Sequence, residues 1–194
     1  MSTPLASAST LGNPAALAKV NQLKAQPRKQ GEAAFFFYDA HFKNAAVKIL
    51  PGEYFVDQED LLVMTTLGSC IAACLWDRVA RIGGMNHFML PEGNGDSGRY
   101  GSFAMELLIN EMMKRGASKA RMEAKIFGGG AVISGMNSLN VGERNTNFVI
   151  DYLKLERIPI VSKDVMDVYP RKDRKSGSAG MPRPYARSRM PSSA

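Results

Sequence analysis

Hydrophobic residues along this chain fall into short runs divided by polar turns, a pattern that is typical of β-strands. The dipeptide Pro51-Gly52 and the acidic stretch at residues 57–60 separate the first of these runs as turns do. An aromatic stretch at residues 33–42 indicates either a strand or a segment that covers the core. We predict strands at residues 47–50, 54–56, 61–66, 69–76, 81–90, 124–127 and 158–162, the last of them buried.

Two further stretches carry apolar side chains at helical spacing. The stripe over residues 102–115 predicts one helix, and Gly116 ends it. A second helix is predicted over residues 145–156, with Asn145 as its cap. Strands combined with two helices in a chain of this size predict a single-domain α/β fold.

The runs at residues 69–76 and 81–90 predict a hairpin that is buried on both faces. A turn at residues 77–80 would place Cys70 directly opposite His87 on the same face. Their Cβ atoms would then lie about 4.5–5.5 Å apart. A register slip of one residue would send the imidazole to the other face.

A thiol beside an imidazole is the minimum needed for a cysteine nucleophile. The imidazole favours the thiolate and can later protonate a poor leaving group. Gly68 and Ser69 let the backbone approach a substrate closely, and their N–H groups can face a developing oxyanion. The other interpretation of Cys70 is a small buried hydrophobe, and the residues alone leave both open.

The two ends of the chain differ from its middle in composition. Residues 1–32 are rich in Ala, Ser, Pro and Gln and predict a mostly disordered arm. Residues 171–194 form a basic, low-complexity tail with seven basic residues and one acidic residue. Because the whole chain carries a net charge of +7, this tail accounts for almost all of it. The folded domain is therefore expected at residues 33–170.

Composition and motifs argue against several classes of protein. The basic tail lacks the interleaved aromatic residues of a nucleic-acid recognition motif. No secretory signal, membrane insertion, metal site or organic cofactor is expected. Gly128-Gly129-Gly130 fits no nucleotide-binding template, and close backbone packing is its expected use. A cysteine phosphatase loop would need an arginine where Trp76 stands. Cys70 and Cys74 predict no disulfide, which fits a reducing cytoplasm.

At the hairpin the chain resembles CheD, the chemoreceptor glutamine deamidase family of bacterial and archaeal chemotaxis. The hairpin carries LGSCIAACLWD followed by IGGMNHFMLP. The resemblance extends over about residues 46–161, through KILPGEY (Lys48–Tyr54), RYGSFAMELLINEM (Arg99–Met112), KIFGGGAV (Lys125–Val132) and GERN (Gly142–Asn145).

This resemblance implies a layered α/β/β sandwich with mainly antiparallel strands and two main helices, related to the catalytic domain of cytotoxic necrotising factor. It implies hydrolysis of glutamine to glutamate on chemoreceptors, with Cys70 as nucleophile and His87 as its partner. The family's third residue, a threonine, falls near Thr65, with Thr66 as the fallback, because Met64 stands at the position six before the cysteine. Candidate substrate-binding residues are Ser69, Asn86 and Arg144, together with the polar loop at residues 92–98.

The implied partners are the cytoplasmic helical domain of methyl-accepting receptors and a CheC-type phosphatase. Thiol proteases and transglutaminases use the same pair of side chains, so they are the chemical alternatives. A non-catalytic module that binds a receptor or a phosphatase is the alternative from another class. The atypical tail is expected to leave a sheet edge exposed where family members continue with strand-forming residues.

Overall fold

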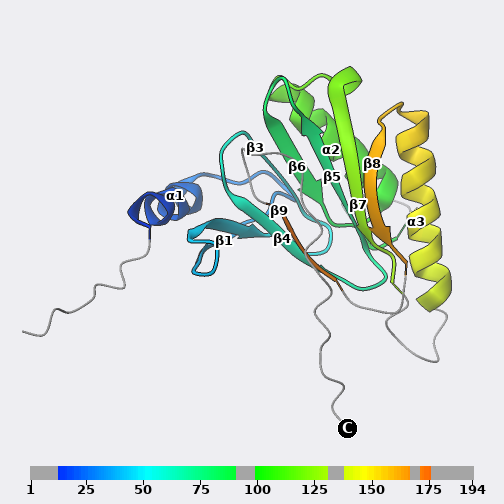
Figure 1. Ribbon diagram of the computed structural model, residues 1–194, viewed down its shortest axis with the longest axis horizontal. Coiled ribbons are helices and arrows are strands. Elements are labelled where there is room, and N and C mark those ends of the chain that lie inside the picture. The colour runs from blue at the N-terminus through cyan, green and yellow to red at the C-terminus, as the bar shows by residue number, and fades with distance from the viewer. Residues whose placement is uncertain (1–12, 91–98, 131–137, 167–170, 176–194) are drawn as a thin grey trace, which may run out of the picture.

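The structure, a computed structural model, describes residues 13–90, 99–130, 138–166 and 171–175 (Figure 1). Two β-sheets stack face to face, and two helices cover the outer face of the larger sheet. This arrangement confirms the predicted α/β/β sandwich with two main helices. The polar loop at residues 92–98 lies outside the described residues.

The larger sheet has five strands, and its central hairpin carries the cysteine and histidine singled out above. All neighbouring strands are antiparallel except β7 and β8, which run parallel. The strand order is β3 (Tyr54–Asp57), β6 (Ile82–Asn86), β5 (Ile71–Asp77), β7 (Met122–Gly128) and β8 (Ile160–Val165).

The smaller sheet has four strands and packs against the hairpin from the other side. Its strand β4 runs parallel to β2, and its other pairs are antiparallel. The strand order is β1 (Phe35–Asp39), β2 (Asn44–Lys48), β4 (Leu62–Leu67) and β9 (Arg171–Lys175).

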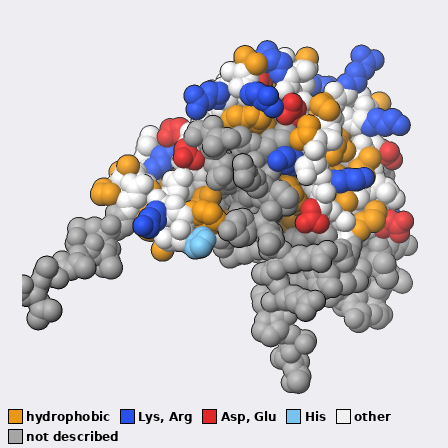
Figure 2. All heavy atoms as spheres, in the orientation of Figure 1, with side chains coloured by type: hydrophobic (Ala, Val, Ile, Leu, Met, Phe, Trp, Pro, Cys, Tyr) orange, Lys and Arg blue, Asp and Glu red, His pale blue; other side chains and the backbone are white. Residues whose placement is uncertain are grey.

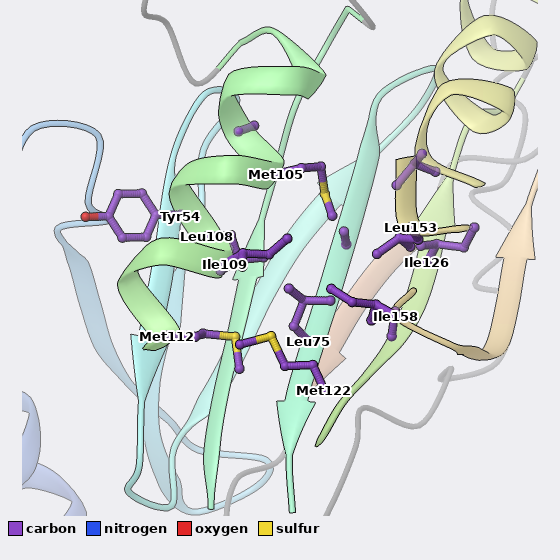
Figure 3. Packing of buried hydrophobic residues seen from close by; sticks show 14 of the residues in the cluster. Tyr54, Leu75, Met105, Leu108, Ile109, Met112, Met122, Ile126, Leu153 and Ile158 are labelled. Carbon is purple, nitrogen blue, oxygen red and sulfur yellow. The ribbon is translucent and has the colours of Figure 1, made fainter. Parts of the chain in front are cut away.

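Helices α2 (Gly101–Lys114) and α3 (Ser138–Leu155) pack on the larger sheet. In Figure 3, Met105 and Leu108 of α2 point toward the sheet, and Leu153 of α3 lies beside Ile126 of β7. A short 3-10 helix, η1 (Lys119–Arg121), leads into β7.

The side chains of β5 alternate between these two interiors. Ile71, Ala73 and Leu75 face the helices, whereas Ala72 and Cys74 face the smaller sheet. Every residue of β5 is buried. The hairpin is therefore buried on both faces, as its apolar sequence predicts.

At the N-terminal end, the structure has a helix where we expected a disordered arm. Helix α1 (Pro14–Ala25) packs on β1 and β2, and Val20 and Leu23 are buried there. The Asn13 side chain accepts a hydrogen bond from the Ala15 amide and so caps the helix. The apolar spacing of this segment is weak, but three buried side chains suffice once a sheet is present to receive them.

The C-terminal part also differs from expectation. Strand β8 lies at the edge of its sheet and is half-exposed, so the prediction of a buried final strand is wrong. Strand β9 pairs with β4, so residues 171–175, expected in the tail, complete an edge of the smaller sheet. Helix α3 begins at Ser138, so Asn145 lies inside the helix and is not its cap.

Charged side chains of both signs are interspersed over the described part of the face in Figure 2. None of the helices within the described ranges is long and apolar enough to cross a membrane.

Candidate active site

The hairpin of β5 and β6 forms as predicted, but its register is shifted. Cys74 pairs with Met85, and Ile71 and Phe88 exchange two backbone hydrogen bonds of 3.0 Å. This register places Ala72 opposite His87, so the prediction that Cys70 lies directly opposite His87 is wrong. The reason is the loop: β5 continues through Asp77, and the connection consists of residues 78–81.

A shift of two residues changes the partner and keeps the face. Cys70 packs against the cluster between the two sheets, and His87 contacts β4 of the smaller sheet. The two residues are therefore diagonal neighbours on one face, where Cα atoms lie about 7–8 Å apart. A cysteine and a histidine side chain can meet across that span.

Asp77 fixes the hairpin loop and thereby its register. Its carboxylate accepts hydrogen bonds from the amides of Val79 (2.9 Å), Ala80 (3.1 Å) and Ser118 (2.8 Å). Arg121 adds an ion pair of 2.8 Å. Burial raises the pKa of Asp77, but the bonds from Arg121 and these amides outweigh it and bring the pKa to about 2. The carboxylate is thus charged at neutral pH.

Thr65 of β4 holds the imidazole of His87 from the opposite sheet. Its hydroxyl lies 2.8 Å from His87 Nδ1 and donates its single proton to the Ile49 carbonyl, also at 2.8 Å. The hydroxyl oxygen must therefore accept a hydrogen bond from Nδ1–H, which assigns the proton of the neutral ring to Nδ1. Thr66 is exposed on the other side of β4, so Thr65 is the threonine that reaches His87.

The second ring nitrogen, His87 Nε2, is buried and has no hydrogen-bond partner among the described residues. Burial lowers the pKa of His87 to about 4, although a hydrogen bond to the Ile49 carbonyl opposes the shift. The ring is therefore neutral at physiological pH, with a free lone pair on Nε2. An imidazole in this state can take a proton from a nearby thiol.

Cys70 lies on a half-buried loop at the start of β5. The glycine-rich loop after β7 packs directly beneath it: Gly129 N donates to the Cys70 carbonyl and Gly130 N to the Gly68 carbonyl, both at 2.8 Å. Gly128 has φ of 108°, and a Cβ there would overlap the Cys70 carbonyl oxygen. This confirms the prediction that the glycines serve close backbone packing beside the hairpin.

Burial raises the pKa of the Cys70 thiol, although a hydrogen bond from its own backbone N–H opposes the shift. Together with the lowered pKa of His87, this favours a neutral thiol beside a neutral imidazole. The two shifts oppose the thiolate that the sequence analysis expected His87 to favour at rest. Proton transfer from sulfur to Nε2 must then accompany attack on a substrate.

The three other predicted site residues lie in different surroundings. Ser69 is half-buried next to Cys70. Asn86 is buried on the helix side of β6, where its amide bonds Ala73 N (3.1 Å) and the Ala104 carbonyl (3.0 Å). It is therefore not brought together with Cys70 and His87. Arg144 is exposed on α3, one residue before a side chain that touches the Cys70 loop.

That side chain belongs to Asn145, which the sequence analysis treated only as a helix cap. Its Nδ2 donates to the carbonyls of Ser69 and Met89, both at 2.9 Å. The sequence contains a pattern that indicates this role. Asn145, Val149 and Leu153 are spaced four residues apart, so Asn145 lies on the buried stripe of α3. A polar residue in register with an apolar stripe indicates a buried hydrogen bond.

The face between the two sheets thus carries the Cys70 thiol, the His87 imidazole with one nitrogen unpaired among the described residues, and the Thr65 hydroxyl that orients this imidazole. These are the parts needed for acyl transfer through a covalent intermediate. Within the described ranges, no three His, Cys, Asp or Glu side chains are grouped so that they could hold a metal ion.

Comparison with known proteins gives consistent relatives. The family described as "CheD chemotactic sensory transduction" matches residues 89–175. The chain is 64% identical over 159 residues to "Probable chemoreceptor glutamine deamidase CheD 1" of Albidiferax ferrireducens, covering 81% of this chain and 68% of that protein. A protein of the same name from Shewanella oneidensis is 54% identical over 143 residues, covering 70% and 69%. "Probable chemoreceptor glutamine deamidase CheD" of Janthinobacterium sp. is 54% identical over 151 residues, covering 74% of each chain.

Proposed function

Because this chain belongs to the CheD family, we propose that it is a chemoreceptor glutamine deamidase in which Cys70 is the nucleophile. It hydrolyses the side-chain amide of receptor glutamine to glutamate and releases ammonia. His87 acts as general base and then general acid, and Thr65 orients it. Ser69 and Arg144 border the substrate.

In the first half of the reaction, Cys70 Sγ bonds to the amide carbon as its proton passes to His87 Nε2. The carbonyl electron pair moves to oxygen and gives a tetrahedral oxyanion. When this oxyanion collapses, the carbon–nitrogen bond breaks, and Nε2 returns the proton to the departing nitrogen. Ammonia leaves, and a thioester to Cys70 remains.

In the second half, water attacks the thioester carbon and loses a proton to His87 Nε2. A second tetrahedral oxyanion collapses with cleavage of the carbon–sulfur bond. The sulfur takes back the proton, which regenerates the thiol and leaves glutamate on the receptor. The same nitrogen serves as base in both halves, so its orientation matters twice.

One observation carries this proposal: the two nitrogens of His87 are differentiated. Nδ1 is held by Thr65 at 2.8 Å, whereas Nε2 has no hydrogen-bond partner in the part of the chain that the structure describes, and the ring is on the hairpin face that also bears Cys70. A histidine with a purely structural role satisfies both nitrogens when it is buried. An unpaired nitrogen beside a thiol is the arrangement that a general base requires.

The substrate segment that we propose is the cytoplasmic helical domain of methyl-accepting receptors, which places the enzyme in the cytoplasm. Thiols at Cys70 and Cys74 are compatible with that compartment. A CheC-type phosphatase is a further partner that we propose on the basis of the family.

The test is incubation of the full chain with a receptor cytoplasmic fragment, followed by mass spectrometry of its glutamine-containing peptides. We expect conversion of glutamine to glutamate by the parent chain. Cys70→Ser and His87→Gln should abolish conversion while leaving receptor binding intact. Cys74→Ala and His41→Ala are matched controls because they remove the other thiol and the other imidazole, and both should retain conversion.

Binding of the receptor without conversion by the parent chain would contradict the deamidase and indicate a non-catalytic binding module. Cleavage of the receptor backbone, or transfer of its glutamine to an amine, would instead indicate a thiol protease or a transglutaminase. Conversion that survives Cys70→Ser would contradict the assigned nucleophile.

A further inference from the structure

Asn145 is joined to the proposed active site through backbone atoms only. Its side chain is fully buried, and its Nδ2 bridges the Ser69 and Met89 carbonyls at 2.9 Å. One amide group therefore ties the loop that carries Cys70 to the strand extension that follows His87. Asn145 Oδ1 accepts no hydrogen bond within the described part of the chain. The two hydrogen bonds that Nδ2 donates therefore hold this side-chain amide in its position.

The loop before β5 presents its carbonyls to one side. The carbonyls of Gly68, Ser69 and Cys70 accept hydrogen bonds from Gly130 N, Asn145 Nδ2 and Gly129 N respectively. Each of these three donors lies on the segments that support the loop, α3 and the glycine-rich loop.

A trans peptide unit points its C=O and its N–H in opposite directions. When Asn145 fixes the Ser69 carbonyl, it therefore also fixes the direction of the Cys70 N–H. Gly130 fixes the Ser69 N–H in the same way through the Gly68 carbonyl. The Ser69 N–H has no acceptor among the described residues, and the Cys70 N–H reaches only the sulfur of its own side chain.

We infer that Asn145 is a positioning residue that aims the Cys70 amide at the oxyanion formed during attack by Cys70. This inference deepens the proposed function and rests on Cys70 as its nucleophile. The N–H groups of Ser69 and Cys70 are each oriented by the hydrogen-bonded carbonyl of the same peptide unit. They therefore form an oxyanion hole that needs no rearrangement during the reaction. Asn145 touches neither substrate nor sulfur, so its effect is confined to steps that develop charge on the substrate oxygen.

The test compares two reactions of Cys70, one of which forms an oxyanion. Propionaldehyde resembles the end of a glutamine side chain and adds to the thiol: sulfur bonds to carbon, the carbonyl pair moves to oxygen, and the thiol proton passes to His87 Nε2, which leaves an oxyanion on the adduct. Iodoacetamide alkylates the same sulfur with loss of iodide and forms no oxyanion. Protection of Cys70 from iodoacetamide by added propionaldehyde gives the affinity for the aldehyde, with mass spectrometry to separate Cys70 from Cys74.

In Asn145→Ala we expect the aldehyde affinity and the deamidation kcat to fall about 10- to 100-fold, because misplacing one donor costs much of its contribution. The alkylation rate without aldehyde should stay within about twofold, because that reaction uses no oxyanion donor. Asn147→Ala is the matched control: Asn147 is exposed two residues along α3, and all three quantities should be unchanged. Should Asn145→Ala fail to fold, Asn145→Asp preserves the shape and carries the same comparison.

An equal fall in aldehyde affinity and alkylation rate would overturn the inference, since that result describes a general loss of loop structure. Unchanged aldehyde affinity would overturn it as well. If the parent chain leaves receptor glutamines intact but the aldehyde comparison gives the expected split, the deamidase proposal fails and the assignment of Asn145 stands.

Discussion

Replacing Thr65 by valine removes one oxygen atom and keeps the shape of the side chain. In the parent chain this oxygen bonds the Ile49 carbonyl and His87 Nδ1, both at 2.8 Å. All three groups lie between the two sheets, where Thr65 and His87 are almost fully buried. Valine leaves a buried N–H and a buried carbonyl without their shared partner.

Each buried polar group left unpaired costs about 1–3 kcal/mol. The Ile49 carbonyl, which already raises the pKa of His87, is close enough to take over Nδ1–H, so one repair can offset part of the loss. We therefore expect Thr65→Val to lower the free energy of unfolding by about 1–3 kcal/mol. We expect kcat for deamidation to fall about tenfold, which corresponds to about 1.4 kcal/mol of lost orientation.

The measurement is the initial rate of glutamate formation on a receptor fragment, together with urea unfolding of each variant. Thr65→Ser retains the hydroxyl and should restore most of the rate, whereas Thr66→Val alters an exposed neighbour and should behave as the parent. A normal kcat in Thr65→Val, with the stability loss present, would refute the role of this hydroxyl in orienting His87. The bond would then be structural only.

Four other outcomes follow from the pKa values and the close packing. The acid limb of kcat/KM should have its midpoint near pH 4, the pKa of His87, and a limb near 6.5 would contradict the buried neutral ring. The free energy of unfolding should rise between pH 4 and 6.5, because the unfolded histidine binds a proton that the folded one does not, and His87→Gln should remove this rise. Gly128→Ala should abolish activity because the added Cβ would overlap the Cys70 carbonyl. Gly116→Ala is its control: Gly116 has a similar φ of 104° but open space around it, so this substitution introduces the backbone strain without the overlap and should stay active in the same assay. Asp77→Asn should lower Tm at neutral pH. In the parent chain, the stability that Asp77 contributes should be lost as pH falls from 3.8 toward 2, because the pKa of Asp77 is lower in the folded than in the unfolded chain. An Asp77→Asn variant whose Tm depends on pH as the parent's does would contradict this role.

Elements with strong local patterns were predictable from the sequence. The apolar stripe over residues 102–115 became α2, and the runs on both sides of residues 78–81 became the central hairpin. These patterns reflect burial, which follows from side-chain periodicity alone. The glycine-rich loop was also interpreted correctly, because three glycines that fit no nucleotide template leave close packing as their use.

The register of the hairpin could not be derived in this way. It depends on whether Asp77 ends a strand or begins a turn, and Ser118 and Arg121, more than 40 residues away, decide this by holding its carboxylate. The prediction of one shared face for Cys70 and His87 survived because the error was an even number of residues.

Long-range contacts explain the remaining misses. Asn145 has no local feature that distinguishes a cap from a buried donor until the Ser69 and Met89 carbonyls are in place. Helix α1 depends on the sheet that covers Val20 and Leu23, and its own sequence is nearly neutral in pattern. Such elements form because tertiary packing overrides weak local preference.

The proposed base and its support come from opposite layers: His87 follows β6 of the larger sheet, and Thr65 belongs to β4 of the smaller one. Turnover should therefore report how the two layers are seated on each other. A displacement of about 1 Å in an active site can cost a hundredfold in rate. Any ligand or mutation that shifts one sheet relative to the other should lower activity well before the protein unfolds. The interface between the two sheets is therefore a target for inhibitors that do not compete with the substrate.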